Sequence, residues 1–165
     1  MDQLAQQLRK VIVAGDRYRR VLARAAGLGA QEAAALGELQ QSGALAPKEL
    51  GRRLGLASAS ITRVLDRLES AGLAQRLRHP ADRRGVLVVL TDAGRVVSKV
   101  MSEVFVGDIE EAMLSARADH LQEYTGVLRD VASALGDRAG DPDRVAAELH
   151  RRGARQGQRG GADQS

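Results

Sequence analysis

The sequence predicts a mainly α-helical protein with one small β-hairpin, an α+β fold, and three observations lead to this prediction. Apolar residues recur at steps of three, four and seven in several long stretches, which is typical of amphipathic helices. Two short apolar segments flank a loop that contains proline and glycine, which indicates a hairpin. Alanine, arginine and leucine are abundant, and all three favour helix. Because only 2% of the residues are aromatic, the core must consist of leucine, valine and alanine.

The length and composition limit the class of protein. A chain of 165 residues fits one domain with an appendage. It contains no cysteine, which excludes disulfides, thiolate zinc sites and cysteine-based redox sensing. The first residues are polar, unlike a signal peptide, and no apolar run approaches the roughly 20 residues that a membrane span needs. We therefore expect a soluble cytoplasmic protein that makes no contact with a membrane.

The first three elements are expected to be helices. The apolar spacing predicts a long helix from about Asp2 to Ala25, which the sequence GLGA ends, and a shorter one around Gln31–Gln41. The following SGALA is expected to be a turn. Pro47–Leu54 is expected to be a short helix, because proline is tolerated at the first helical position, and Gly55 ends it. Ala46 stands where a polar capping residue is commoner.

The fourth helix, Ala59–Ala71, is expected to follow the third after a short link. Its apolar residues share one face and are predicted to be buried: Ile61, Val64, Leu65 and Leu68. The Ser58 hydroxyl is expected to cap its start, and Gly72 to end it in a left-handed conformation. The tight link between the two helices predicts a helix-turn-helix.

A hairpin and two further helices are expected next. Leu73–Arg78 and Val86–Leu90 are predicted strands, which form a wing, and Thr91 is expected to cap a helix from about Asp92 to Ser115. The last clear helix, about Asp119–Leu135, has a heptad seam that needs a partner helix in the same chain or in a second chain. The seam consists of Leu121, Tyr124, Leu128, Val131 and Leu135. Beyond it, we expect one short helix that starts at Pro142 and then disorder.

The middle of the chain is strongly basic. Between Pro47 and Gly85 there are nine basic and four acidic side chains, whereas Val86–Leu135 has four basic and eight acidic ones. A basic segment within a nearly neutral chain indicates binding to a polyanion. The alternative is a charged surface that only contacts solvent.

The outward face of the fourth helix carries residues suited to reading DNA. Small and hydroxyl side chains come first, followed by Arg63 and Arg67, four residues apart. Small side chains let the helix approach the major groove, hydroxyl groups reach phosphates or bases, and arginine can present two donors to guanine. The alternative is that both arginines pair with Asp66 and Glu69 on an exposed face.

The tip of the wing offers a second contact. Asp82 can hold Arg84 extended by a charge-assisted hydrogen bond, and an extended arginine fits the narrow, electronegative minor groove. The helix and the wing would then contact adjacent grooves of one duplex. The alternative is a charged loop without a function.

The segment LGLASASITRVLDRLESAGLAQRLRHPADRRGVLVVLTDAGR, Leu54–Arg95, resembles the winged helix-turn-helix of the MarR family of transcriptional regulators. The resemblance rests on a leucine-spaced helix that ends in AGL, then Arg76, DRRGVLVVLT and a GR helix start, and it extends more loosely to about Leu135. It implies that the N- and C-terminal helices form a dimerisation domain. The implied division is 1–28 and 116–135 for dimerisation, 29–91 for DNA binding, 92–115 as a long connecting helix and 136–165 as a tail.

The resemblance also implies roles for individual residues. Contacts in the major groove are expected from Ser58, Ser60, Thr62, Arg63 and Arg67. In the wing, Arg84 enters the minor groove, Asp82 orients it, Arg83 lies near phosphate, and Arg76 supports the wing or a phosphate. The protein is expected to regulate transcription by binding a palindromic operator in double-stranded DNA as a homodimer. Repression is the commoner mode in the family, so a repressor is expected.

A small phenolic or anionic effector is a further expectation from the resemblance. Such a molecule would bind between the dimerisation helices and the winged lobe and favour a geometry that does not bind DNA. The candidate lining residues are Arg17, Tyr18, Met101 and Phe105, with core or surface positions as the alternative.

No enzyme, metal or cofactor function is expected. The sequence has no Ser-His-Asp grouping, phosphate-binding glycine loop or paired carboxylates. Its histidines, His79, His120 and His150, are scattered, and a pair formed by His120 and Glu123 fits a solvated helix start better than a metal site. The remaining alternative function is a winged-helix interaction module whose basic face docks an acidic protein.

Overall fold

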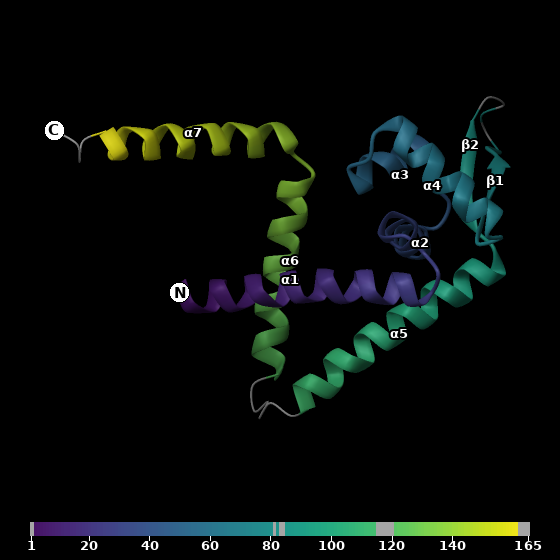
Figure 1. The fold of residues 1–165 in the computed structure, drawn as a ribbon, viewed down its shortest axis with the longest axis horizontal. Coiled ribbons are helices and arrows are strands. Elements are labelled where there is room, and N and C mark those ends of the chain that lie inside the picture. Colours follow the sequence, from purple (N-terminus) through teal and green to yellow (C-terminus); the bar gives the residue numbers. More distant parts are fainter. Residues whose placement is uncertain (1, 81, 83–84, 115–120, 162–165) are drawn as a thin grey trace. The chain divides into compact units, whose positions relative to one another are not determined.

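The computed structural model of the chain describes residues 2–80, 82, 85–114 and 121–161, and Figure 1 draws its course. The chain divides into two compact units, Met1–Ser115 and Ala116–Ser165. The described part of the first unit contains five helices and one hairpin, and that of the second contains two helices. This mostly helical architecture with a two-stranded antiparallel hairpin confirms the predicted fold class.

The helices and strands follow the predicted order. Their bounds are α1 Asp2–Ala25, α2 Ala30–Ser42, α3 Pro47–Leu54, α4 Ser58–Ser70, β1 Ala74–Arg78, β2 Val86–Leu90, α5 Asp92–Leu114, α6 Leu121–Ala139 and α7 Pro142–Gly161. In the first unit α2 is central, because it contacts α1, α3, α4, α5 and β2. Figure 1 views α2 nearly along its axis, with α3 and α4 on one side and α1 and α5 on the other.

The core of the first unit lies between α2, α3, α4 and the hairpin. Its largest fully buried side chains are Leu36, Leu50, Leu65, Leu68 and Val88. All four apolar residues predicted to face inward from α4 are buried, because they form one stripe along the helix. Burying one leucine or valine side chain stabilises the fold by about 1.5–3 kcal/mol. The packing of this stripe determines which residues of α4 face outward.

The hairpin is tied to the turn that precedes α3. β1 and β2 are antiparallel, with Ala74 opposite Leu90 and Arg78 opposite Val86. The sequence SGALA, expected to be only a turn, also pairs with β2. The Leu45 amide donates to the Val88 carbonyl at 3.1 Å, and the Val88 amide donates to the Leu45 carbonyl at 2.8 Å. These two bonds satisfy backbone groups beside the buried Val88 side chain.

In the first unit, most predicted helix ends are confirmed, and the predicted cap of α4 is wrong. Gly55 and Gly72 adopt the left-handed conformation, with φ of 64° and 67°. Thr91 caps α5, since its hydroxyl oxygen accepts a hydrogen bond from the Gly94 amide at 3.0 Å. Ser58, by contrast, is the first helical residue of α4, and the capping position falls on Ala57. Because Ala57 has no side-chain acceptor, the amides of the first turn lack a side-chain cap.

The C-terminal helices are longer than expected. The last clear helix was expected to end at Leu135, whereas α6 reaches Ala139, and α7 extends over 153–161, where we expected disorder. That expectation rested on the lack of apolar residues. Helical hydrogen bonds are local, however, and Asp141 supports the start of α7 by accepting from the Arg144 amide at 3.0 Å. Among the residues that the structure describes, no helix is long and apolar enough to cross a membrane.

The backbone of α5 approaches the base of the hairpin so closely that only glycine fits at position 94. A Cβ on Gly94 would lie 1.9 Å from the carbonyl oxygen of Leu73. Gly107, in the same helix, has nothing within 4 Å of such a Cβ. The two glycines therefore form a matched pair for testing this contact.

We predict that Gly94→Ala lowers the free energy of unfolding by about 3 kcal/mol or more, because α5 must move away from the hairpin. Gly107→Ala is expected to raise it by about 0.5–1 kcal/mol, since alanine loses less backbone entropy in a helix. Urea unfolding of both variants tests the prediction. Equal effects at the two positions would show that the contact with Leu73 does not matter.

Candidate nucleic-acid interface

The outward face of α4 presents the small and hydroxyl residues that sequence analysis selected. Ser58 and Thr62 are exposed, and Ser60 is half-buried. The Thr62 hydroxyl donates to the carbonyl of Ser58 at 3.0 Å, which leaves its oxygen lone pairs on the surface. This face has no bulky side chain ahead of Arg63, so another molecule can approach its backbone closely.

Arg63 is an exposed cation on this face. Among the residues that the structure describes, no side chain forms a hydrogen bond or an ion pair with it. The alternative in which Arg63 and Arg67 pair with Asp66 and Glu69 is therefore not what the fold produces. All the donors of the Arg63 guanidinium remain available to a ligand.

Arg67 lies on the same face but contacts a different helix. Its Nη1 donates to Oε1 of Glu32, on α2, at 2.9 Å. The Glu32 side chain is only 6% exposed, whereas that of Arg67 is 71% exposed. Sequence analysis missed Glu32, although there was a signal: it lies three and four residues before Ala35 and Leu36, on the buried face of α2.

Arg76 connects the wing to α4. Its guanidinium forms an ion pair with Glu69 and another with Asp66, whose Oδ1 is 2.9 Å from Nη2. The Arg76 amide also donates to Glu69 at 2.9 Å. Asp66 and Glu69 thus hold β1 rather than the arginines of their own helix. Of the two roles expected for Arg76, this geometry favours support of the wing.

The described end of the wing is closed by backbone hydrogen bonds. The Gly85 amide donates to the Asp82 carbonyl at 2.9 Å, and the His79 amide donates to the Gly85 carbonyl at 2.9 Å. Asp82 is exposed, and its backbone amide donates to Nδ1 of His79 at 3.1 Å. Arg83 and Arg84 lie outside the described residues, so their predicted contacts remain predictions.

A polar network that sequence analysis also missed joins α2 and α3. Glu49 accepts hydrogen bonds from Arg52 and Arg53, at 2.7–2.9 Å. Arg53 donates further to Glu38 and Ser42 of α2, each at 2.7 Å. The hydrogen bonds from Arg52 and Arg53 lower the pKa of the Glu49 carboxyl from about 4.5 to about 2. The spacing of Glu49, Arg52 and Arg53 along one helix was the available signal.

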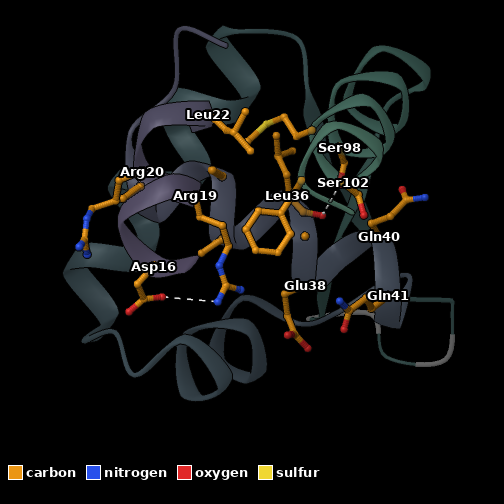
Figure 2. A pocket seen from close by; sticks show the side chains of 16 residues that line it. Asp16, Arg19, Arg20, Leu22, Leu36, Glu38, Gln40, Gln41, Ser98 and Ser102 are labelled. Carbon is orange, nitrogen blue, oxygen red and sulfur yellow. Dashed lines mark hydrogen bonds and ion pairs between the residues drawn. The ribbon is translucent and has the colours of Figure 1, made fainter. Parts of the chain in front are cut away.

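A cavity of about 610 Å³ lies between α1, α2 and α5. Two of the four candidate effector residues, Met101 and Phe105, line it, whereas Arg17 and Tyr18 do not. Figure 2 shows Arg19 and Asp16 on one side of the cavity and Ser98 and Ser102 on the other. The volume is in the range of small-molecule sites, 300–1,000 Å³.

Aromatic and charged groups surround Phe105. The Tyr18 ring stacks on it with 5.8 Å between ring centroids, and the Arg19 guanidinium carbon lies 5.4 Å from its centroid. The Tyr18 hydroxyl donates to Asp108, and this hydrogen bond raises the pKa of Tyr18. Within the described ranges, no group of three His, Asp or Glu side chains could hold a metal ion. His120 lies outside those ranges.

The sequence is similar to known regulators. A sequence profile described as "MarR family" matches residues 28–86. The HTH-type transcriptional regulator YcgE of Bacillus subtilis (strain 168) is 31% identical over 108 residues, which are 66% of this chain and 65% of YcgE. The multiple antibiotic resistance protein MarR of Escherichia coli (strain K12) is 33% identical over 88 residues, which are 53% of this chain and 61% of MarR. The chain thus spans slightly less than two thirds of the length of these two curated relatives.

Solved structures extend this similarity beyond the winged lobe. The crystal structure of the reduced form of MarR from E. coli has a TM-score of 0.63 at 30% identity and covers 78% of this chain and 95% of MarR. The crystal structure of NadR in complex with 4-hydroxyphenylacetate has a TM-score of 0.64 at 25% identity and covers 81% of this chain and 92% of NadR. The structural matches cover more of the chain than residues 28–86, which the sequence profile matches. They must therefore include helices on either side of that segment.

We predict that the Glu49 carboxyl titrates with a midpoint near pH 2. Because folding lowers its pKa, the stability that Glu49 contributes is complete above about pH 4.5 and is lost as the pH falls through 2. NMR titration of the side-chain carboxyl carbon measures the midpoint directly. The double variant Arg52→Met/Arg53→Met removes both donors, so the midpoint should return towards 4.5. A wild-type midpoint of 4 or above would contradict the network.

Proposed function

Because this chain belongs to the MarR family of transcriptional regulators, which are not enzymes, we propose that it represses transcription by binding a palindromic operator as a homodimer. The observation that carries the proposal is the outward face of α4, where Arg63 has no described partner behind a row of small and hydroxyl residues. This face belongs to a helix-turn-helix with a wing beside it. Such an arrangement suits insertion of α4 into the major groove.

Each residue of the interface has a proposed task. Arg63 reads a base edge with two donors, and Ser58, Ser60 and Thr62 contact phosphates or bases. Arg67 lies on the same face with one donor committed to Glu32. In the wing, Arg84 enters the minor groove with Asp82 orienting it, Arg83 lies near phosphate, and Arg76 fixes the wing to α4.

The proposed dimer follows from apolar residues that single chains leave exposed. On α1 these include Leu4, Val11 and Ile12, and on α6 they include Tyr124, Leu128 and Leu135. Exposed apolar side chains on these helices support packing against a further helix, which we propose that a second chain supplies. We assign 1–28 and 116–135 to dimerisation, 29–91 to DNA binding and 92–115 to the connection, with 136–165 as an addition of undefined role.

We further propose that a small phenolic or anionic effector releases the DNA. The cavity between α1, α2 and α5 offers it the ring of Phe105 and the charge of Arg19. The structurally similar NadR was crystallised with 4-hydroxyphenylacetate, a molecule of this chemical class. A ligand there would favour one arrangement of α1, α2 and α5 over another and so shift the population away from the DNA-binding state.

Selection of bound duplexes from a random DNA pool tests the function. We expect enrichment of a two-fold symmetric motif with half-sites about one helical turn apart, bound with an affinity that falls steeply as salt rises. If no duplex is enriched at low ionic strength, the proposal is wrong. A basic winged helix that docks an acidic protein then becomes the better explanation.

We predict that Arg63→Ala and Arg84→Ala weaken operator binding in different ways. Arg63→Ala should cost about 1–3 kcal/mol and relax the preference for one base, because it removes a contact to a base edge. Arg84→Ala should reduce the salt slope by about 1 and leave secondary structure intact. Fluorescence anisotropy with operator variants at several salt concentrations separates these effects. Lys99→Ala, which removes an exposed cation from α5, serves as the control and should bind like wild type.

A further inference from the structure

A nearly buried carboxylate contacts the helix that we propose reads DNA. Glu32 lies in the first turn of α2 and is 6% exposed at its side chain, yet it carries an ionisable group. The hydrogen bond that the structure gives it comes from Nη1 of Arg67 at 2.9 Å. Arg67 and Glu32 are 35 positions apart in the sequence, so this bond is a tertiary contact between α4 and α2.

The backbone next to Glu32 leaves room for this carboxylate. A Cβ on Gly29 would lie 1.9 Å from Oε2 of Glu32. Gly29 has φ of −76°, a conformation that any residue adopts, so the constraint there is space: a side chain at position 29 would make the end of the Glu32 side chain shift. The sequence before α2 thus accommodates one particular position of the Glu32 side chain.

Arg67 cannot leave Glu32 without a penalty. A buried carboxylate that loses its partner keeps the cost of its removal from water without the compensating hydrogen bond, and this destabilises the fold. A phosphate on DNA would have to compensate for that cost before Arg67 could move to it. Since most of the Arg67 side chain is exposed, its other N–H groups can still face outward while Nη1 stays on Glu32.

We propose that Glu32 is a positioning residue for DNA recognition: by holding Arg67, it fixes the orientation of α4 against α2 and keeps Arg67 in one conformation beside Arg63. The inference rests on the proposed function, because it assigns a task within DNA binding. In this arrangement Arg63 contacts the base, and the hydrogen bond between Arg67 and Glu32 fixes α4 relative to α2. Glu32 acts through Arg67 and does not touch the nucleic acid.

Simple electrostatics gives the opposite expectation for one substitution. Removing a negative charge from the DNA-binding lobe should strengthen binding to a polyanion if long-range charge alone matters. If Glu32 positions Arg67, Glu32→Gln weakens binding although the protein becomes more positive, because a neutral amide oxygen holds the guanidinium less strongly than a carboxylate. The sign of the change in affinity therefore distinguishes positioning from charge.

The experiment uses the full chain and the operator duplex obtained by selection. The variants are Glu32→Gln, Arg67→Met, the double variant Glu32→Gln/Arg67→Met and Gly29→Ala, with Glu103→Gln as a control that removes an exposed carboxylate from α5. Affinity is measured over a range of salt at a temperature where every variant is folded, and the melting midpoint of each is recorded.

We expect Glu32→Gln, Arg67→Met and Gly29→Ala each to weaken operator binding by about tenfold, and the double variant to be no weaker than the single ones, because all disturb one contact. Glu103→Gln should bind like wild type or slightly more tightly. Arg67→Met should melt at a lower temperature than the double variant, since only Arg67→Met leaves a buried carboxylate unpaired. If Arg67→Met does not fold, the double variant and Gly29→Ala carry the test.

Two outcomes would overturn the inference while the proposed function stands. In one, the wild type binds its operator and Glu32→Gln binds as tightly or more tightly. In the other, the effects of Glu32→Gln and Arg67→Met on affinity add, and only Arg67→Met reduces the salt slope, which would make Arg67 an independent phosphate contact. If the wild type binds no duplex at all, the proposed function itself fails.

Discussion

The burial of one apolar stripe on α4 is the constraint on which the rest of the molecule depends. Ile61, Val64, Leu65 and Leu68 pack into a core almost without aromatic rings, against α2, α3 and the hairpin. Because a helix repeats every 3.6 residues, fixing these four positions also fixes which residues point away from the core. The surface that we propose contacts DNA is thus the face of α4 opposite the buried stripe. Core packing does not determine which side chains occupy that face.

Ionic contacts then refine what the apolar stripe determines. On one side Arg67 joins α4 to Glu32 of α2, and on the other Asp66 and Glu69 join it to Arg76 of the wing. Apolar packing alone allows a helix to slide or rotate slightly, whereas hydrogen bonds with fixed geometry at two sides restrict such motion. The more exposed of these pairs, Arg76 with Asp66, contributes little to stability by itself. These contacts fix the orientation of α4.

Much of the fold could be predicted from the sequence, because periodic apolar residues and end signals such as Pro47, Gly55, Gly72 and Thr91 act locally. The errors have physical causes. Ser58 is a plausible cap from sequence, but α4 begins at Ser58 itself, one residue earlier than expected. The extent of α7 could not be deduced from its lack of apolar residues. The partners of Arg67 and Arg76 could not be predicted either. They come from other elements, and for Arg67 local spacing suggested the nearer carboxylates Asp66 and Glu69.

The bridge between Leu45 and Val88 anchors the base of the wing, so the base and the tip of the wing differ in how they are held. At its base, β2 is bonded to β1 on one edge and to the segment before α3 on the other, so this end forms part of the same rigid lobe as the helix-turn-helix. Among the described residues between Arg78 and Val86, none has a backbone hydrogen bond to the segment before α3. Insertions or deletions there would alter the reach of the tip without disturbing α4. Related proteins could therefore acquire different preferences for the DNA that flanks a site while their central recognition sequence stays the same.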